Sequence, residues 1–367
     1  MDSGYDVAMP PRSRSGSLKV VLFSLLPAIV LLVTGEVGAR VYFTLRNRDA
    51  HYLVAPYGMA RSYPFRIGAT WTRHDRCTGR TLTLQSHDLG GRGPDWPRSK
   101  PSGTLRVIAA GGSSTFGINN PYDGTWPVLL ERRLRAALGR PVDVLNAGQP
   151  GRRLEHIVGQ LPAWTARAQP DAVIYYEGYN NAYPYDVGRF HEGPGRLLYA
   201  LYYSSMLYTY LVEKVNLAGA TWEQTFAKEM ALFRAQLPRF VARVRESGAT
   251  PVFVLQVTDP LPDGPLDGLL IDDHAAVVAH IRRATTGRRS LTNAEAGVLI
   301  ELVRRAGQEL SVPVIDPRPV FAAHPEHRAL FCSEVHLTDT GNQVLAEAIA
   351  AQLAPQLIPE GAAARTK

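Results

Sequence analysis

The sequence is poor in cysteine, with only Cys77 and Cys332 among its 367 residues. The two stand far apart and match no zinc or iron–sulfur spacing, so they make no metal motif. In an exported domain they would form one disulfide, whereas the alternative is two separate buried thiols. The sequence leaves both possibilities open.

Other signatures are also missing from the chain. It has no Gly-rich phosphate loop, no dinucleotide-binding fingerprint and no cluster of metal ligands. Its formal net charge is +7, but no block of Lys and Arg with interleaved aromatic residues accompanies the charge. We therefore expect no cofactor, no metal and no nucleic-acid partner. The basic bias is weak and would be of use near anionic lipid or polysaccharide.

An apolar stretch lies near the N-terminus. Residues 20–35 carry no charge, and a helical pattern continues through Glu36 and Arg40 to Phe43. The whole segment is long enough to cross a bilayer, which takes roughly 20 residues. The basic residues that precede it predict that the N-terminus is cytoplasmic and the remainder lies outside.

We expect residues 1–17 to form a cytoplasmic tail and residues 18–43 to form a transmembrane anchor. The small residues at 37–39 also suit a signal peptidase, so a cleaved signal peptide is one alternative. A buried core helix is the other, and the cationic flank argues against it. Residues 44–104 show little periodicity and end in a Pro-rich stretch, which predicts a connector that packs on the following domain.

Strand-like and helix-like segments alternate over residues 105–357. The expected strands are 107–110, 142–146, 172–177, 251–256 and 313–316, and the expected helices are 126–138, 154–168, 222–246, 293–310 and 340–353. This alternation predicts one α/β domain with a parallel sheet covered by helices on both faces. Right-handed crossovers would bring all the carboxyl ends of the strands to one edge. Residues 358–367 are expected to be a disordered tail.

Two insertions interrupt this alternation. Residues 182–214 carry seven tyrosines and should border the crevice, either as a lid or substrate platform or as an extra helix that buries aromatic area. Residues 258–291 are rich in Pro, Gly and Asp at first and in Arg later, and the basic end is typical of a solvated face.

A serine follows the first strand of the domain at its carboxyl end. Residues 107–110 form a short apolar run, and two glycines at 111 and 112 end it abruptly. Ser113 is then placed where open parallel sheets form their ligand crevice, and this position suits a nucleophile. The alternative is an ordinary strand–turn–helix joint with Ser113 as the helix N-cap.

Four short motifs occur in the order typical of one enzyme family. Residues 111–117 read Gly-Gly-Ser-Ser-Thr-Phe-Gly, residues 146–148 Asn-Ala-Gly, residues 178–181 Gly-Tyr-Asn-Asn and residues 333–336 Ser-Glu-Val-His. Together they resemble the four blocks of the SGNH/GDSL hydrolases over about residues 106–357. The resemblance implies a three-layer α/β/α, flavodoxin-like fold with about five parallel strands. The N-terminal transmembrane helix expected from the apolar stretch would precede this fold.

The resemblance also implies roles for individual residues. Ser113 would be the nucleophile and His336 the general base. The oxyanion hole would consist of the backbone N–H groups of Ser113 and Gly148 and the side-chain amide of Asn180. Without the resemblance, His336 is an ordinary histidine before a helix and Asn180 an ordinary turn residue.

The chain departs from the family pattern at two positions. Gly112 replaces the Asp of the first block, and Ser333 replaces the Asp that normally orients the imidazole of the base. We therefore expect a Ser–His dyad. Glu334 is a candidate acid. It is one residue further along than position 333, however, and in an extended chain its side chain would point in the opposite direction to that of residue 333.

These observations predict a serine esterase anchored in the bacterial inner membrane by a single helix, with its catalytic domain in the periplasm. Its expected partners are the membrane and an acylated small molecule or glycan. The family resemblance implies that the substrates are O-acyl, especially O-acetyl, esters of glycans. An O-acyltransferase that modifies an exported polysaccharide is one alternative. A catalytically degenerate glycan-binding protein is the other, because the triad acid is missing.

Overall fold

The computed structural model describes residues 14–47, 68–75, 77–182, 201, 205–208, 210, 211, 221–259, 272–285 and 288–357. Most of the tyrosine-rich insertion, the early part of the second insertion and the expected disordered tail lie outside these residues, as do the first 13 residues of the expected cytoplasmic tail.

Helices and strands alternate through the described part of the domain. The strands are β1 (Thr70–His74), β2 (Thr81–Gln85), β3 (Leu105–Gly111), β4 (Val142–Asn146), β5 (Ala172–Tyr176), β6 (Thr250–Val254) and β7 (Val314–Ile315). The helices are α1 (Arg14–Asn47), α3 (Ser113–Phe116), α4 (Trp126–Leu138), α5 (Leu154–Ala168), α8 (Trp222–Glu246), α9 (His274–Ala284), α10 (Arg288–Glu309), α11 (Arg318–Ala323) and α12 (Asp339–Leu353). Two short 3₁₀ turns also matter here. One, η3 (Tyr179–Ala182), follows β5, and the other, η6 (His327–Leu330), precedes the loop that carries His336.

Five strands form a parallel sheet in the order β4-β3-β5-β6-β7. Every residue of β3 is buried, as expected for a central strand that has helices on both faces. The predicted three-layer α/β/α fold with five parallel strands is therefore confirmed. The sequence placed each of these strands within one or two residues of its observed ends.

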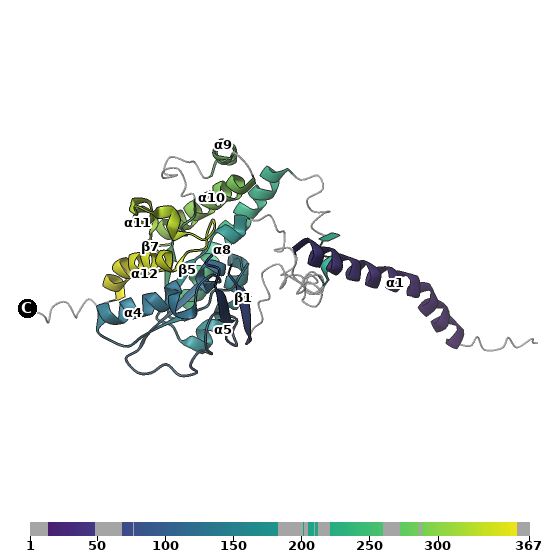
Figure 1. Cartoon of the computed structure of the whole chain (residues 1–367), viewed down its shortest axis with the longest axis horizontal. Coiled ribbons are helices and arrows are strands. Elements are labelled where there is room, and N and C mark those ends of the chain that lie inside the picture. Colours follow the sequence, from purple (N-terminus) through teal and green to yellow (C-terminus); the bar gives the residue numbers. More distant parts are fainter. Residues whose placement is uncertain are drawn as a thin grey trace, which may run out of the picture.

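Two hydrophobic cores lie on opposite faces of this sheet. Helices α5, α8 and α10 pack on one face, where the core includes Ile108, Val173 and Phe253. Helices α4 and α12 pack on the other, around Val107 and Ile174. Figure 1 shows α4 and α12 side by side. Successive residues of β5 thus face different cores, and its sequence is continuously apolar for this reason.

The strand order places a switch point between β3 and β5. The chain leaves β3 toward β4 on one side and then returns to β5 on the other side of β3. Connections that leave two neighbouring strands in opposite directions open a crevice at their carboxyl ends. Ser113 follows β3 and η3 follows β5, so both of these segments border the same crevice.

Several elements differ from the sequence expectation. The connector contains an antiparallel hairpin of β1 and β2, and the second insertion contains α9. Helix α10 begins at Arg288 rather than at residue 293, and α11 was not expected. The hairpin was missed because its strands have five residues each and carry mostly polar residues on the outward face. Leu82 and Leu84 supply its buried side and pack with Phe116 and Ile118 beside the turn that carries Ser113.

Helix α1 projects away from the domain (Figure 1). Its segment Phe23–Tyr42 has 20 residues and a mean hydropathy of 1.6, and none of its most apolar stretch is buried in the protein. By length and composition this segment is able to cross a membrane. A signal sequence near the N-terminus meets the same criteria. Near its carboxyl end, Glu36 pairs with Arg40 at 2.7 Å and accepts hydrogen bonds from the backbone N–H groups of Met206 and Leu207.

Candidate active site

The loop at the carboxyl end of β3 presents Ser113. Gly112 links β3 to the four-residue helix α3, which begins at Ser113, and Gly117 closes the turn with a left-handed φ of 71°. A glycine suits this last position because other residues rarely adopt a positive φ. Ser113 is largely buried, and no described residue accepts a hydrogen bond from its backbone N–H.

His336 reaches the same point from the far end of the sequence. Its Nε2 lies 2.8 Å from Ser113 Oγ, although 223 positions separate the two residues. The loop that carries His336 is fixed by the hydrogen bond from Ser114 Oγ to the Val335 carbonyl, at 2.8 Å. The structure thus brings together the two residues that the sequence assigned as nucleophile and base.

The second ring nitrogen of His336 faces Ser333. The distance from Nδ1 to Ser333 Oγ is 2.7 Å, so serine hydroxyls occupy both ring nitrogens. For Nε2 to take the Ser113 proton, Nδ1 must carry the ring hydrogen and donate it to Ser333 Oγ. The backbone carbonyl of Glu334, the next residue, accepts a hydrogen bond from the Asp259 N–H. Ser333 therefore stands where a triad would have its acid.

The surroundings of His336 favour the neutral imidazole. Burial is the largest cause and, with the positive charge of Arg73, lowers the pKa of His336 to about 4, while the charge of Asp75 opposes the shift. A neutral imidazole is the form that accepts a proton, so His336 is in the form that a general base needs over a wide pH range. An imidazolium formed here would have no adjacent carboxylate to stabilise it.

The structure shows the Gly148 N–H engaged within the protein. It donates to Asn146 Oδ1 at 2.9 Å, so this bond occupies the donor that the sequence assigned to the oxyanion hole. A Cβ at position 148 would lie 2.2 Å from the backbone nitrogen of Phe116, so the glycine allows the loop after β4 to pack against α3.

A second glycine lies three residues further along this loop. Gly151 is exposed and has a φ of 70°, and no described residue accepts a hydrogen bond from its N–H. Asn180 lies next to it, because Asn180 Nδ2 donates to the carbonyl oxygen of Arg152 at 2.9 Å. An amide nitrogen carries two hydrogens, so one remains for a ligand. Sequence reasoning missed Gly151, which the Asn-Ala-Gly motif does not include.

Sequence reasoning also assigned no role to Glu177, the residue directly after β5. Its Oε1 accepts hydrogen bonds from the N–H groups of Gly178 and Asn180, both at 3.0 Å. Burial raises the pKa of Glu177 to about 7, although backbone N–H groups that include that of Gly112 lower it. A carboxylate at the end of an otherwise apolar strand was the available signal.

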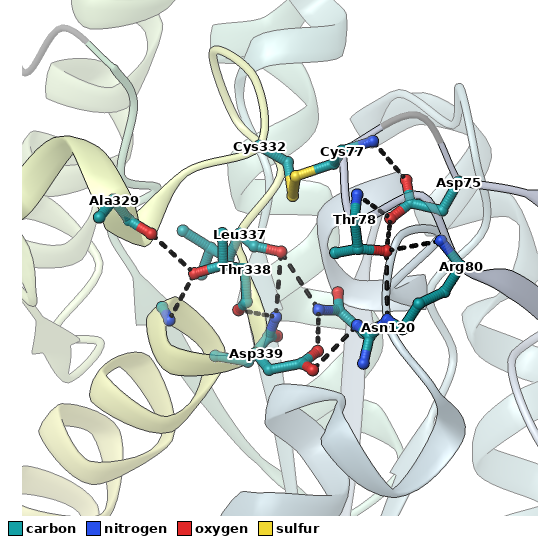
Figure 2. A network of polar contacts seen from close by, with 12 residues as sticks. Asp75, Cys77, Thr78, Arg80, Asn120, Ala329, Cys332, Leu337, Thr338 and Asp339 are labelled. Carbon is teal, nitrogen blue, oxygen red and sulfur yellow. Dashed lines mark hydrogen bonds and ion pairs between the residues drawn. A yellow bond between two sulfur atoms is a disulfide. The ribbon is translucent and has the colours of Figure 1, made fainter.

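A disulfide links the histidine loop to the hairpin. Cys332, which precedes Ser333, is bonded to Cys77 in the turn between β1 and β2. This turn is held by Asp75, whose carboxylate accepts hydrogen bonds from the N–H groups of Cys77 and Thr78 (Figure 2). Of the two alternatives left open by the sequence, the structure has the disulfide.

A polar network continues from this disulfide to the start of α12. Asp339 forms an ion pair with Arg80 at 2.9 Å and accepts a hydrogen bond from Asn120 Nδ2 at 2.9 Å (Figure 2). Asn120 also donates to the Leu337 carbonyl, next to His336. These contacts therefore hold three segments together, namely the β1–β2 hairpin, the segment with Asn120 and the loop that carries His336.

Replacing both cysteines with serine should lower the melting temperature by about 5–15 °C. The cross-link joins residues 255 positions apart, and the loss of such a bridge costs about 2–5 kcal/mol of folding free energy. Thermal melts followed by circular dichroism, with and without reductant, would measure the difference. The double variant serves as the control, since reductant should not change its melting temperature. Equal melting temperatures for the oxidised and reduced wild type would contradict the prediction.

The described residues include no group of three or more His, Cys, Asp or Glu side chains that could hold a metal ion. The crevice brings together a serine hydroxyl, an imidazole and neutral hydrogen-bond donors. Such a set suits acyl transfer, in which negative charge develops on a carbonyl oxygen.

Comparison with known proteins gives a family and a set of similar folds. The sequence profile of the GDSL-like Lipase/Acylhydrolase family matches residues 109–344. The lipase/acylhydrolase from Enterococcus faecalis is 18% identical, with 70% of this chain and 100% of that one covered and a TM-score of 0.43. A lipolytic protein of the G-D-S-L family from Veillonella parvula is 15% identical, with 67% and 97% covered and a TM-score of 0.41. An acetyl xylan esterase is 14% identical, with 69% and 100% covered and a TM-score of 0.41. Among proteins with curated descriptions, none matches this chain.

Proposed function

Since this chain belongs to the GDSL-like Lipase/Acylhydrolase family, a family of ester hydrolases, we propose that it cleaves carboxylic esters with Ser113 as nucleophile and His336 as general base. The observation that carries the proposal is the 2.8 Å distance between Ser113 Oγ and His336 Nε2. A serine hydroxyl is a poor nucleophile at neutral pH and needs a base at hydrogen-bond distance.

The reaction would proceed in two steps. Ser113 Oγ forms a bond to the acyl carbon while its proton moves to His336 Nε2, and the carbonyl electron pair moves onto oxygen. When this intermediate collapses, the bond to the alcohol breaks and His336 gives its proton to the departing oxygen. Water then attacks the acyl-serine by the same route, with His336 again taking and returning a proton, and releases the acid.

We assign the oxyanion hole to three donors. They are the N–H of Ser113, the free hydrogen of the Asn180 amide and the N–H of Gly151. The first and third have no acceptor among the described residues, as donors kept for a ligand should. The N–H of Gly148, the donor expected from the sequence, would first have to break its hydrogen bond to Asn146 Oδ1 before it could bind an oxyanion. Preorganised donors of this kind stabilise the charge that develops in the transition state.

A fluorophosphonate probe and an ester panel test this activity. The full chain in detergent should become labelled, and it should hydrolyse p-nitrophenyl acetate and release acetate from O-acetylated xylan. The assay should be repeated with an added glycan acceptor, because acyl transfer that exceeds release to water would identify an acyltransferase. A folded protein that is neither labelled nor active on any ester would overturn the proposal and favour glycan binding.

We further propose that the domain faces the periplasm, anchored by α1, and acts on O-acyl esters of glycans. Three observations support this location. Phe23–Tyr42 is apolar and unburied, basic residues precede it, and Cys77 and Cys332 form a disulfide, a bond rare in the cytosol. The hydrogen bonds between Glu36 and residues 206 and 207 would then hold this part of the 182–214 insertion at the membrane surface.

A reporter that is active only outside the cytoplasm, fused after Lys367, should be active. The protein should also remain with the membranes after a salt wash, because a spanning helix is not held by charge. A soluble form that begins near Arg40 would show a cleaved signal peptide instead. An inactive reporter on a stable fusion would contradict export.

A further inference from the structure

The inference concerns the carboxylate of Glu177 and rests on the proposed function. Glu177 lies at the carboxyl end of β5, at the switch point where β5 and β3 are neighbours. It is 2% exposed, and no described residue forms an ion pair with it. A buried carboxylate without a cation is costly unless N–H groups satisfy it. Its partners therefore indicate what it does.

Those partners belong to two different strand ends. Oε1 accepts from the N–H groups of Gly178 and Asn180, and Asn180 is the proposed side-chain donor of the oxyanion hole. The N–H of Gly112, the residue before the nucleophile, also hydrogen-bonds to the carboxylate. One side chain thus fixes the backbone on both sides of the crevice.

The space beside Gly112 explains why this residue is a glycine. Its φ is −92°, outside the left-handed region that favours glycine. A Cβ at position 112 would instead lie 2.0 Å from Glu177 Oε2 and 2.4 Å from Asn180 Nδ2. The carboxylate of Glu177 therefore occupies the volume that a side chain at position 112 would need.

We propose that Glu177 is a positioning residue that supplies, from β5, the carboxylate next to the nucleophile that an Asp at position 112 would supply from β3. It holds the Gly112 backbone and Asn180 in register with Ser113, and so sets the geometry of the oxyanion hole. The carboxylate that the first motif lacks at position 112 is then still present in the site, but it comes from the end of β5 instead of the end of β3.

Glu177→Gln tests whether the carboxylate is needed. The amide keeps the size of the side chain but presents an NH₂ group to N–H donors, which repels one of them. We expect kcat on p-nitrophenyl acetate to fall about 10–100-fold while KM changes less than about twofold, because the damage falls on the oxyanion hole. Glu131→Gln is the matched control, since Glu131 accepts the Val144 N–H at 2.8 Å away from the crevice and its pKa is also raised by burial.

The pH profile distinguishes positioning from a merely structural role. With a pKa of about 7, Glu177 loses its charge as the pH falls through neutrality, and the rate should fall with it. Glu177→Gln should remove this limb and leave only the limb of His336, near pH 4. A variant that only loosens the fold would instead lower its melting temperature and keep both limbs.

A swap of the two positions completes the test. Gly112→Asp alone should reduce activity at least as much as Glu177→Gln, because its side chain overlaps the Glu177 carboxylate. Combined with Glu177→Gly, the same Asp should recover at least about tenfold in kcat over Gly112→Asp. An active wild type with an unimpaired Glu177→Gln variant would overturn this inference alone. A wild type that is unlabelled and inactive would overturn the proposed function and this inference with it.

Discussion

Replacing Ser113 with alanine is expected to lower the rate of ester hydrolysis by roughly 10⁴–10⁶-fold and to abolish fluorophosphonate labelling. The hydroxyl is the group that forms the acyl-enzyme, and His336 Nε2 is placed at 2.8 Å to receive its proton. The fold should be unaffected, since Ser113 Oγ has its hydrogen bond with that imidazole rather than with the backbone. Activity and labelling of the purified variant, with its melting temperature, would measure the effect.

Two hydroxyls beside Ser113 provide the control. Ser114 Oγ donates to the Val335 carbonyl at 2.8 Å, and Thr115 Oγ1 points to the carbonyl of Tyr176. Both are engaged in holding loops, so neither faces a base. Ser114→Ala should therefore keep the label on Ser113, although a looser histidine loop would slow turnover. A Ser113→Ala variant that labels as well as the wild type would show that the nucleophile lies elsewhere.

The fold was largely predictable from the sequence because a doubly wound sheet leaves a strong local signal. Strands buried on both faces read as continuous apolar runs, and the helices between them keep their 3.6-residue spacing. The hairpin of β1 and β2 gives no such signal. Its buried side consists of little more than Leu82 and Leu84, and its stability comes from the disulfide and from contact with Phe116.

The candidate site was predictable where chain topology alone brings residues together. Ser113 and Asn180 follow neighbouring strands, so the parallel sheet places them at one edge whatever their side chains do. Gly151 and Glu177 were missed for a different reason. Their roles depend on which backbone N–H groups already have acceptors in the folded protein, as the N–H of Gly148 does. A local sequence pattern does not show which N–H groups are already hydrogen-bonded.

The second large expected effect concerns Ser333. Replacing it with aspartate should raise kcat by at least about tenfold, toward the roughly 10⁴-fold that separates a full triad from one without its acid. In the wild type the Nδ1 hydrogen meets the neutral Ser333 Oγ at 2.7 Å, which orients the ring but does little for the imidazolium. A carboxylate at this position adds charge stabilisation to the orientation.

The pH profile should change in a defined direction. His336 has a pKa of about 4 in the wild type, because burial and Arg73 disfavour its charged form. An aspartate beside it favours the charged form and raises this pKa, by about 1–3 units. The acid limb set by His336 must therefore move to higher pH, while the plateau above it rises. Measuring both profiles in the Glu177→Gln background removes the limb near neutrality and isolates that of His336.

Glu334→Gln and His336→Ala complete the comparison. Glu334→Gln should change kcat little, because Ser333 already occupies Nδ1, whereas His336→Ala should be nearly inactive. A large loss in Glu334→Gln without a gain in Ser333→Asp would move the acid role to Glu334. If Ser333→Asp raises kcat and shifts the His336 limb upward, the wild-type site is a working dyad, because a carboxylate can improve only an imidazole that already accepts the proton of Ser113.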